Sequence, residues 1–340
     1  MKMEADLFYP LTQRSIMLLL TTLSIGGTKD LSLLAFLPQR ERDLLVEKAN
    51  QLQQLESRQR LLIMNQEMKR HFLFRGLVGI ESIEPSWIIP ILEKENPKIV
   101  AVILNNLSSS YKKKVLQKLS LKLRGEIKLF EDQSMTSVEM ARSIRQIFES
   151  QFAQMPLNRK LLSFRFEDIT VLSTQELIHL IRVLGVEELA AAFASIGQRA
   201  LMDFCMRLDE KNRQELVEAY RQLNNDENLI DGNLAKTFLA KVLTNFNNSD
   251  ELFQKAGMYR LAKSLLYSES LFVSQVAQRF PQVHGNILLG YVDSLKKKIE
   301  QFPLKECYAI QNRILHKIKK LAEIGKIDSQ LLNLTFTLVN

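Results

Sequence analysis

The residues Glu95, Asn96, Pro97 and Lys98 form a short polar segment directly before a strongly apolar stretch, 99–104. Asparagine accepts hydrogen bonds from backbone amides at a helix start, and proline suits the first helical turn because no N–H is needed there. The stretch that follows is apolar on nearly every side, which is typical of a helix buried in a helical array. We therefore predict a rigid polar corner at the surface, where a partner protein can dock.

A second set of charged residues lies on a helix predicted for residues 208–223. At about 100° per residue, one side of this helix is apolar. That side comprises Leu208, Leu216, Ala219, Tyr220 and Leu223. A neighbouring stripe carries Lys211, Glu215 and Glu218. The stripe is either a solvated face with ion pairs worth a few tenths of a kcal/mol each, or a contact edge that orients a charged partner.

Residues suited to catalysis do not gather in the sequence. The four histidines are scattered, and His179, among leucines, is expected to be a packed side chain. Gly26-Gly27 lacks the lysine and the strand that a phosphate loop needs. The pair Glu167-Asp168 suits a helix N-terminus, where the dipole favours negative charge. We expect no catalytic residue, no cofactor and no small-molecule substrate.

The two cysteines, Cys205 and Cys307, are far apart and lack the spacing of metal ligands. They are predicted to be buried or free thiols of a reducing compartment, and no metal site is expected. The apolar run 15–25 is shorter than the roughly 20 residues that span a bilayer, and it lacks a signal-peptide cleavage site. It is predicted to be a buried helix of a cytoplasmic protein.

The composition indicates an all-α protein of two or three domains. Among 340 residues, 46% are hydrophobic, with only 12 glycines and 8 prolines. The net charge is +8, and residues 251–340 contribute +6 of it, from 13 basic and 7 acidic residues. The basic groups 296–298, Lys317, Lys319 and Lys320 leave nucleic-acid binding open as a lesser alternative. Against it, aromatic residues are not interleaved with these lysines, and no helix-turn-helix signature is present.

The elements that position the polar corner and the charged helix are predicted to be short helical layers, each too small to bury its own face. Predicted helices cover 12–24, 31–37, one long segment from 38 to 69, 96–107, a segment capped by Ser108 or Ser109, 136–152, a segment capped by Ser173 and Glu176, 189–193, 199–207 and 305–324. Gly325 is predicted to end the last of these as a left-handed cap. In the helix 136–152, Met140, Ile144, Ile147, Phe148 and Phe152 recur at helical spacing.

These layers are expected to form armadillo-like or HEAT-like stacks joined by helical linkers. Three domains are predicted: an N-terminal helical domain, 1–75; a middle armadillo-like domain, 76–158; and a C-terminal helical domain, 159–340, that carries the charged helix 208–223. The first boundary follows from the helix breakers between Phe72 and Pro90.

Four stretches, in this order along the chain, resemble the FliG family of the bacterial flagellar motor switch. The first is 14–51, with SIMLLL and LAFLP. The second is Glu95-Asn96-Pro97-Lys98 with the apolar helix after it, similar to the family's Glu-His-Pro-Gln motif. The third is FRFEDI, 164–169, similar to Phe-x-Phe-Glu-Asp-Leu and followed by the charged helix. The fourth is 311–327, ending in LAEIGKI.

The resemblance implies a divergent FliG-like structural component of the flagellar motor, active in motility and chemotaxis, and not an enzyme. In that family the N-terminal domain binds the membrane-ring protein FliF, and the middle domain binds the switch protein FliM through the Glu-His-Pro-Gln surface. The C-terminal charged helix faces the stator and receives torque. The resemblance also implies self-association in a ring and a cytoplasmic, peripheral location on the inner membrane at the flagellar basal body.

The chain departs from the family at several of these positions. Asn96 stands for the histidine and Lys98 for the glutamine of the middle motif. Aligned from Phe166, the torque-helix arginine falls on Lys211, the paired acids on Glu218 and Ala219, and an upstream lysine on Ala194. These lost charges leave open a non-rotary scaffold of a secretion or flagellum-derived complex.

Overall fold

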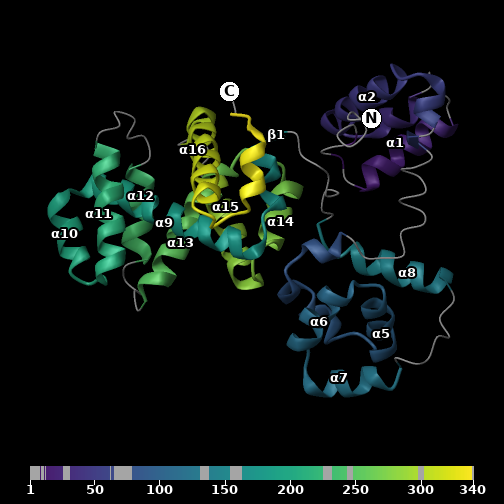
Figure 1. The fold of residues 1–340 in the computed structure, drawn as a ribbon, viewed down its shortest axis with the longest axis horizontal. Coiled ribbons are helices and arrows are strands. Elements are labelled where there is room, and N and C mark those ends of the chain that lie inside the picture. The colour runs from purple at the N-terminus through teal and green to yellow at the C-terminus, as the bar shows by residue number, and fades with distance from the viewer. Residues whose placement is uncertain are drawn as a thin grey trace. The chain divides into compact units, whose positions relative to one another are not determined.

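The computed structural model describes residues 8, 11, 13–25, 31–61, 63–64, 79–130, 138–153, 163–224, 232–242, 248–297 and 302–338. The chain divides into two compact units, residues 1–162 and 163–340 (Figure 1). The predicted all-α fold is confirmed, because the regular elements of the described residues are helices apart from one pair of two-residue strands. The unit boundary lies close to the predicted domain boundary at 158/159, and the division at 75/76 stays a prediction.

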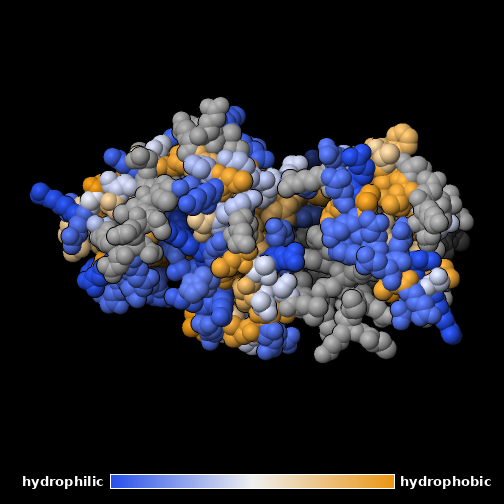
Figure 2. Space-filling model, turned by 90° about the horizontal axis from the view of Figure 1, so that it is seen from above, coloured by the Kyte–Doolittle hydropathy of each residue, from blue (hydrophilic) through white to orange (hydrophobic). Residues whose placement is uncertain are grey.

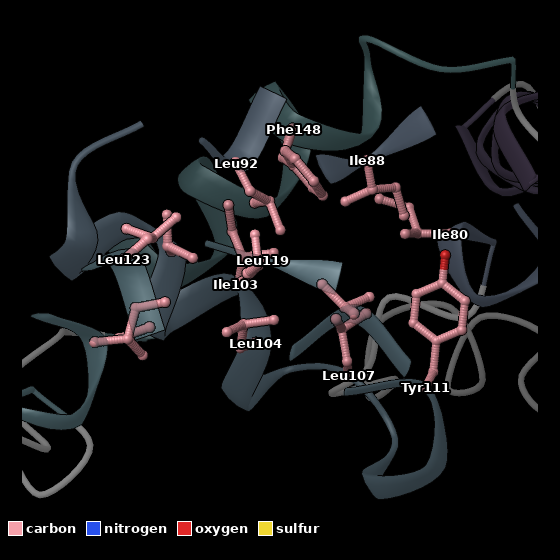
Figure 3. Close-up of a cluster of buried hydrophobic side chains, with 14 of the residues drawn as sticks. Ile80, Ile88, Leu92, Ile103, Leu104, Leu107, Tyr111, Leu119, Leu123 and Phe148 are labelled. Carbon is pink, nitrogen blue, oxygen red and sulfur yellow. The ribbon is translucent and has the colours of Figure 1, made fainter. Parts of the chain in front are cut away.

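The first unit is built from short helices. Its α-helices are α1 (Gln13–Ile25), α2 (Gln39–Gln53), α4 (Ile89–Leu92), α5 (Pro97–Asn105), α6 (Ser109–Lys118), α7 (Leu121–Lys128) and α8 (Val138–Glu149). Its 3-10 helices are η1 (Ser32–Phe36), η2 (Ile80–Ser82) and η3 (Pro85–Trp87). Two separate hydrophobic clusters hold these elements together, one from residues 8–64 and one from residues 80–152. Figure 3 shows the second cluster. The half-buried Trp87 packs against this cluster.

The second unit is built around one long helix, α9 (Thr174–Ile196). The other α-helices are α10 (Gln198–Cys205), α11 (Glu210–Asn224), α12 (Gly232–Val242), α13 (Ser249–Ser264), α14 (Ser270–Gln278), α15 (Gln282–Lys296) and α16 (Leu304–Glu323). The remaining elements are η4 (Phe166–Val171), η7 (Ser329–Asn333) and the parallel strands β1 (Ser163–Phe164) and β2 (Thr335–Phe336). Helix α9 packs against α11, α12 and α13, and α13 in turn packs against α15 and α16 (Figure 1).

Local helix signals in the sequence are confirmed by the structure. Ser108 caps α6, and Ser173 and Glu176 form the predicted capping box, with N···O distances of 2.7 and 3.3 Å. Gly325 ends α16 with a φ of 70°, the left-handed conformation that glycine adopts readily. Thr136, the first residue of the helix predicted for 136–152, lies outside the described residues.

The long helix predicted from 38 to 69 is wrong as one element. Helix α2 ends at Gln53, residues 54–56 interrupt it, and a second helical segment begins at Ser57. A straight helix of that length would extend about 48 Å, well beyond the diameter of a small domain. The interruption lets Leu52 and Ile63 pack into the same hydrophobic cluster.

The two helices predicted around 177–181 and 189–193 are one helix, α9, because it is covered along its length by neighbouring helices. His179, expected to be packed, is exposed. It lies roughly opposite the buried side of α9 formed by Leu177, Leu180 and Ile181.

The apolar side predicted for the helix 136–152 is only partly buried. Phe148 and Phe152 pack into the cluster, whereas Met140 is 59% and Ile147 66% exposed on α8. The described part of α8 covers the cluster with one narrow side, so apolar residues at its margin remain in solvent.

The rest of the surface is mixed. In the face that Figure 2 shows, hydrophilic residues predominate and hydrophobic residues lie in small groups.

Candidate functional site

The polar corner is held in one conformation by local hydrogen bonds. Asn96 is extended, with φ of −63° and ψ of 134°, and its Oδ1 accepts a hydrogen bond of 3.0 Å from the backbone amide of Lys98. Pro97 begins α5, as predicted. Behind the corner, α5 buries Val100, Ala101, Ile103 and Leu104. The buried helix fixes the position of the exposed corner.

The charged side chains of the corner face different surroundings. Lys98 is exposed, and its Nζ lies 5.3 Å from the centroid of the Phe130 ring, beyond the end of α7. That distance allows a cation–π interaction, which is worth about 0.5–1 kcal/mol at exposed sites. Glu95 is half-buried. The corner therefore presents Lys98 and Asn96 to solvent, next to α7.

Glutamates of the preceding turns connect the corner to the next helices. The Glu93 carboxylate accepts hydrogen bonds from the backbone amide and hydroxyl of Ser120, at 2.6 and 2.9 Å, just before α7. Glu81 accepts a 2.6 Å hydrogen bond from the amide of Ser108, just before α6. Carboxylates are favoured at helix N-termini, so these contacts fix α6 and α7 relative to the corner.

Glu84 and Tyr111 complete this arrangement. Burial opposes ionisation of Glu84, but hydrogen bonds from Lys118, at 2.6 Å, and from Ser86 outweigh it and lower the pKa of the carboxyl group. The Tyr111 hydroxyl, directed toward η2 in Figure 3, donates a 2.6 Å hydrogen bond to the carbonyl of Ile83. The layers of this domain are joined by polar contacts as well as by the hydrophobic cluster.

The charged helix predicted for 208–223 is α11, Glu210–Asn224. Leu208 and Leu216 are buried, whereas Ala219, Tyr220 and Leu223 are half-buried. Asp209 precedes the helix, and a hydrogen bond from the backbone amide of Asn212 to its carboxylate lowers its pKa.

The charged stripe of α11 is not uniform. Lys211 and Glu218 are exposed, but Glu215 accepts a 2.6 Å hydrogen bond from Nη1 of Arg182 on α9. The same guanidinium donates to the side-chain oxygen of Asn212. Glu215 therefore ties α11 to α9, and two of the three charged positions remain available to a partner. The polar corner and α11 belong to different units.

A buried network of charges in the second unit was not found from the sequence. The fully buried carboxylate of Glu188 on α9 lies 2.5 Å from Nζ of Lys263 and 3.3 Å from Nη1 of Arg260, both on α13. Glu187 lies 3.3 Å from Arg260 and 2.7 Å from Lys317 on α16. Burial opposes ionisation of Glu187, yet Arg260 and Lys317 outweigh it and lower its pKa.

The network also bears on the nucleic-acid alternative, since Lys317 is paired with Glu187 and is therefore not free to bind phosphates.

Both cysteines are buried free thiols, and burial raises the pKa of Cys307 to about 11. Within the described ranges, no three His, Cys, Asp or Glu side chains gather as a metal ion would require. None of the described helices has the length and apolar character of a membrane span.

Comparison with known families finds a match for one part of the chain, which includes the polar corner. Residues 85–159 match the family model described as the FliG middle domain, and the polar corner lies inside the matched region. The chain therefore contains a segment similar to the FliG middle domain.

Solved FliG structures are also similar to the chain, at low identity. The crystal structure of residues 116–343 of FliG from H. pylori is 12% identical, covers 75% of this chain and 96% of that one, and has a TM-score of 0.24. Full-length FliG from Aquifex aeolicus is 13% identical, covers 92% of this chain and 97% of that one, and has a TM-score of 0.21. Because both TM-scores are low, the assignment depends on the family model. No curated protein matches the sequence.

Proposed function

We propose that the protein is a rotor and switch component of a flagellar motor that acts through protein contacts and catalyses no reaction. The observation that carries this proposal is the rigid, exposed corner Glu95–Lys98 within the FliG middle domain. In this proposal the middle domain binds a FliM-like switch protein, residues 1–75 bind a FliF-like membrane-ring protein, and copies of the chain associate in a ring. The location is cytoplasmic, on the inner face of the inner membrane.

The corner suits such a contact for physical reasons. Its backbone is already ordered by the Asn96 cap and by the buried helix α5, so a partner loses little free energy in ordering it. Lys98 replaces the glutamine of the family motif and adds a positive charge at the exposed end of the corner. Charge at an interface mainly sets orientation and association rate, so we expect the partner surface opposite Lys98 to be acidic.

Torque transfer through α11 is the finer part of the proposal. Lys211 and Glu218 are exposed and oppositely charged, as a contact edge with a charged stator requires. Ala194 and Ala219 stand where the family has charges, and this observation favours the second candidate, a non-rotary FliG-like scaffold of a secretion or flagellum-derived complex.

A swimming assay separates these functions. Deletion of the gene is expected to abolish swimming, and the wild-type gene to restore it. The double reversal Lys211→Glu with Glu218→Lys is expected to keep the fold, because both side chains are exposed, and to slow swimming severalfold. The matched control, Lys320→Glu with Glu323→Lys on α16, reverses an equally exposed pair and is expected to swim normally.

The outcomes exclude different parts of the proposal. A deletion strain that still swims contradicts the motor role. A deletion strain that does not swim, combined with a Lys211 and Glu218 reversal that swims at the wild-type speed, contradicts torque transfer and supports the scaffold.

A further inference from the structure

The exposed face of α7 combines leucine and lysine side chains. Leu121 is 80% and Leu129 71% exposed, and Lys122, Gly125 and Lys128 are exposed as well. At 3.6 residues per turn, these five positions fall within an arc of about 120°. The opposite side of α7 is buried through Leu123 and Ile127. The face is therefore a continuous outward surface with two apolar side chains and two positive charges.

The neighbouring helix α6 extends the positive charge. Between residues 109 and 130 the sequence has seven lysines and arginines and one acid, Glu126. Lys113 and Lys114 are exposed, whereas Lys118 is paired with Glu84. Lysine side chains around exposed leucines favour an occupant that is itself acidic and partly apolar.

The face of α7 is continuous with the polar corner. At its start, Ser120 donates to Glu93, which lies two residues before Glu95. Beyond its end, the ring of Phe130 lies 5.3 Å from Nζ of Lys98. The corner and the exposed face of α7 thus form one surface, which we name the α7 surface: Lys98, Leu121, Lys122, Gly125, Lys128 and Leu129.

The shape of the α7 surface suits a helix. Leu121 and Leu129 are separated by about 12 Å along the helix axis, which matches two apolar residues seven or eight positions apart on a second helix. Gly125 lies between them, and a Cβ added there would meet no atom within 4 Å. A glycine between two large side chains leaves a saddle in which the backbone of a crossing helix can approach closely. A lipid surface would not need this saddle.

We propose that the α7 surface binds an acidic amphipathic helix of the switch protein, whose two apolar residues pack beside Leu121 and Leu129 and whose carboxylates face Lys98, Lys122 and Lys128. This inference depends on the proposed function, because it assigns the chemistry of the partner that docks at the corner.

The test uses the full chain and two probes. One is a synthetic helical peptide of about five turns with two leucines seven positions apart, flanked by glutamates; the other is the FliM-like protein of the same bacterium. Leu121→Asn with Leu129→Asn is expected to weaken binding of both probes about tenfold or more, because the complex would no longer bury two leucine side chains. Gly125→Gln is expected to weaken both by filling the saddle. Leu338→Asn, at another exposed leucine, is expected to change neither.

The charge of the surface is tested in the same way. Lys122→Glu with Lys128→Glu is expected to weaken both complexes most strongly at low salt, and Lys319→Glu with Lys320→Glu, on α16, to leave them unchanged. A peptide with lysines in place of the glutamates is expected not to bind. The substituted residues are exposed, so each variant is expected to unfold at a thermal midpoint no lower than that of the wild type, which confirms that it folds.

The proposal is overturned if the acidic peptide does not bind, or if the leucine variant binds the switch protein as tightly as the wild type does. Binding of the peptide without the switch protein contradicts the proposed function and the assignment of the helix to that partner. Binding of anionic lipid vesicles that is lost in the leucine variant but kept in Gly125→Gln shows that the occupant is a membrane and overturns the proposal.

Discussion

Replacing Glu188 with glutamine is expected to destabilise the second unit by about 3–5 kcal/mol, because it leaves buried positive charge without its carboxylate partner. Glu188 and Lys263 are fully buried, and Arg260 is 2% exposed, so water cannot solvate the charges that remain. A loss of this size is a large fraction of the stability of a typical domain.

The measurement is denaturant unfolding followed by two probes. Trp87, the single tryptophan, lies in the first unit, so its fluorescence reports that unit, whereas circular dichroism reports the helices of both. In Glu188→Gln we expect an earlier transition in the dichroism and an unchanged transition in the fluorescence. The control, Glu323→Gln, alters an exposed glutamate of α16 and is expected to change neither.

A compensating variant tests the physical reason. Replacing Glu188, Arg260 and Lys263 together with apolar residues of similar volume is expected to recover most of the lost stability, because no unpaired charge is left in the interior. If Glu188→Gln unfolds at the wild-type denaturant concentration, the network does not stabilise the packing of α9 on α13.

Replacing Gly257 with alanine is expected to destabilise the same unit by about 3 kcal/mol, at the upper end of the usual range for overpacking. A Cβ at Gly257 would lie 1.8 Å from the carbonyl oxygen of Ile181, and one at Gly185 would lie 1.9 Å from that of Phe253. The two glycines therefore let the backbones of α9 and α13 touch, and an added methyl group must push the helices apart.

The matched control for this change is Gly290→Ala on α15. It makes the same substitution within a helix, at an exposed site where a Cβ would meet no atom within 4 Å. Alanine is the better helix former, so we expect this variant to gain about 0.5–1 kcal/mol. Thermal unfolding should therefore shift in opposite directions for the two variants. If Gly257→Ala does not lower the midpoint, α9 and α13 are not in backbone contact.

Features set by neighbouring residues could be predicted from the sequence. The Asn96–Pro97 corner, the Ser173–Glu176 capping box and the Gly325 cap each depend on a few consecutive residues, and the structure has all three.

Features that depend on distant residues could not be predicted in this way. Glu188 and Lys263 are 75 residues apart, and nothing near Glu188 in the sequence identifies its partner. A signal was present, since Glu187-Glu188 interrupts an apolar helix and Arg260 and Lys263 lie three positions apart in another. The hydrogen bond from Arg182 to Glu215 also depends on which helices become neighbours in the fold. The same is true of the exposure of Leu121.

The most direct test of the central claim is the affinity of the full chain for the FliM-like switch protein of the same bacterium, measured by titration calorimetry. We predict a specific complex for the wild type and a complex weakened about tenfold or more by Lys98→Glu, which reverses the exposed charge of the corner without disturbing the Asn96 cap. Lys236→Glu, at an exposed lysine of α12, should bind as the wild type does. Absence of a complex, or equal affinity of the wild type and Lys98→Glu, would contradict a switch-protein contact at this corner.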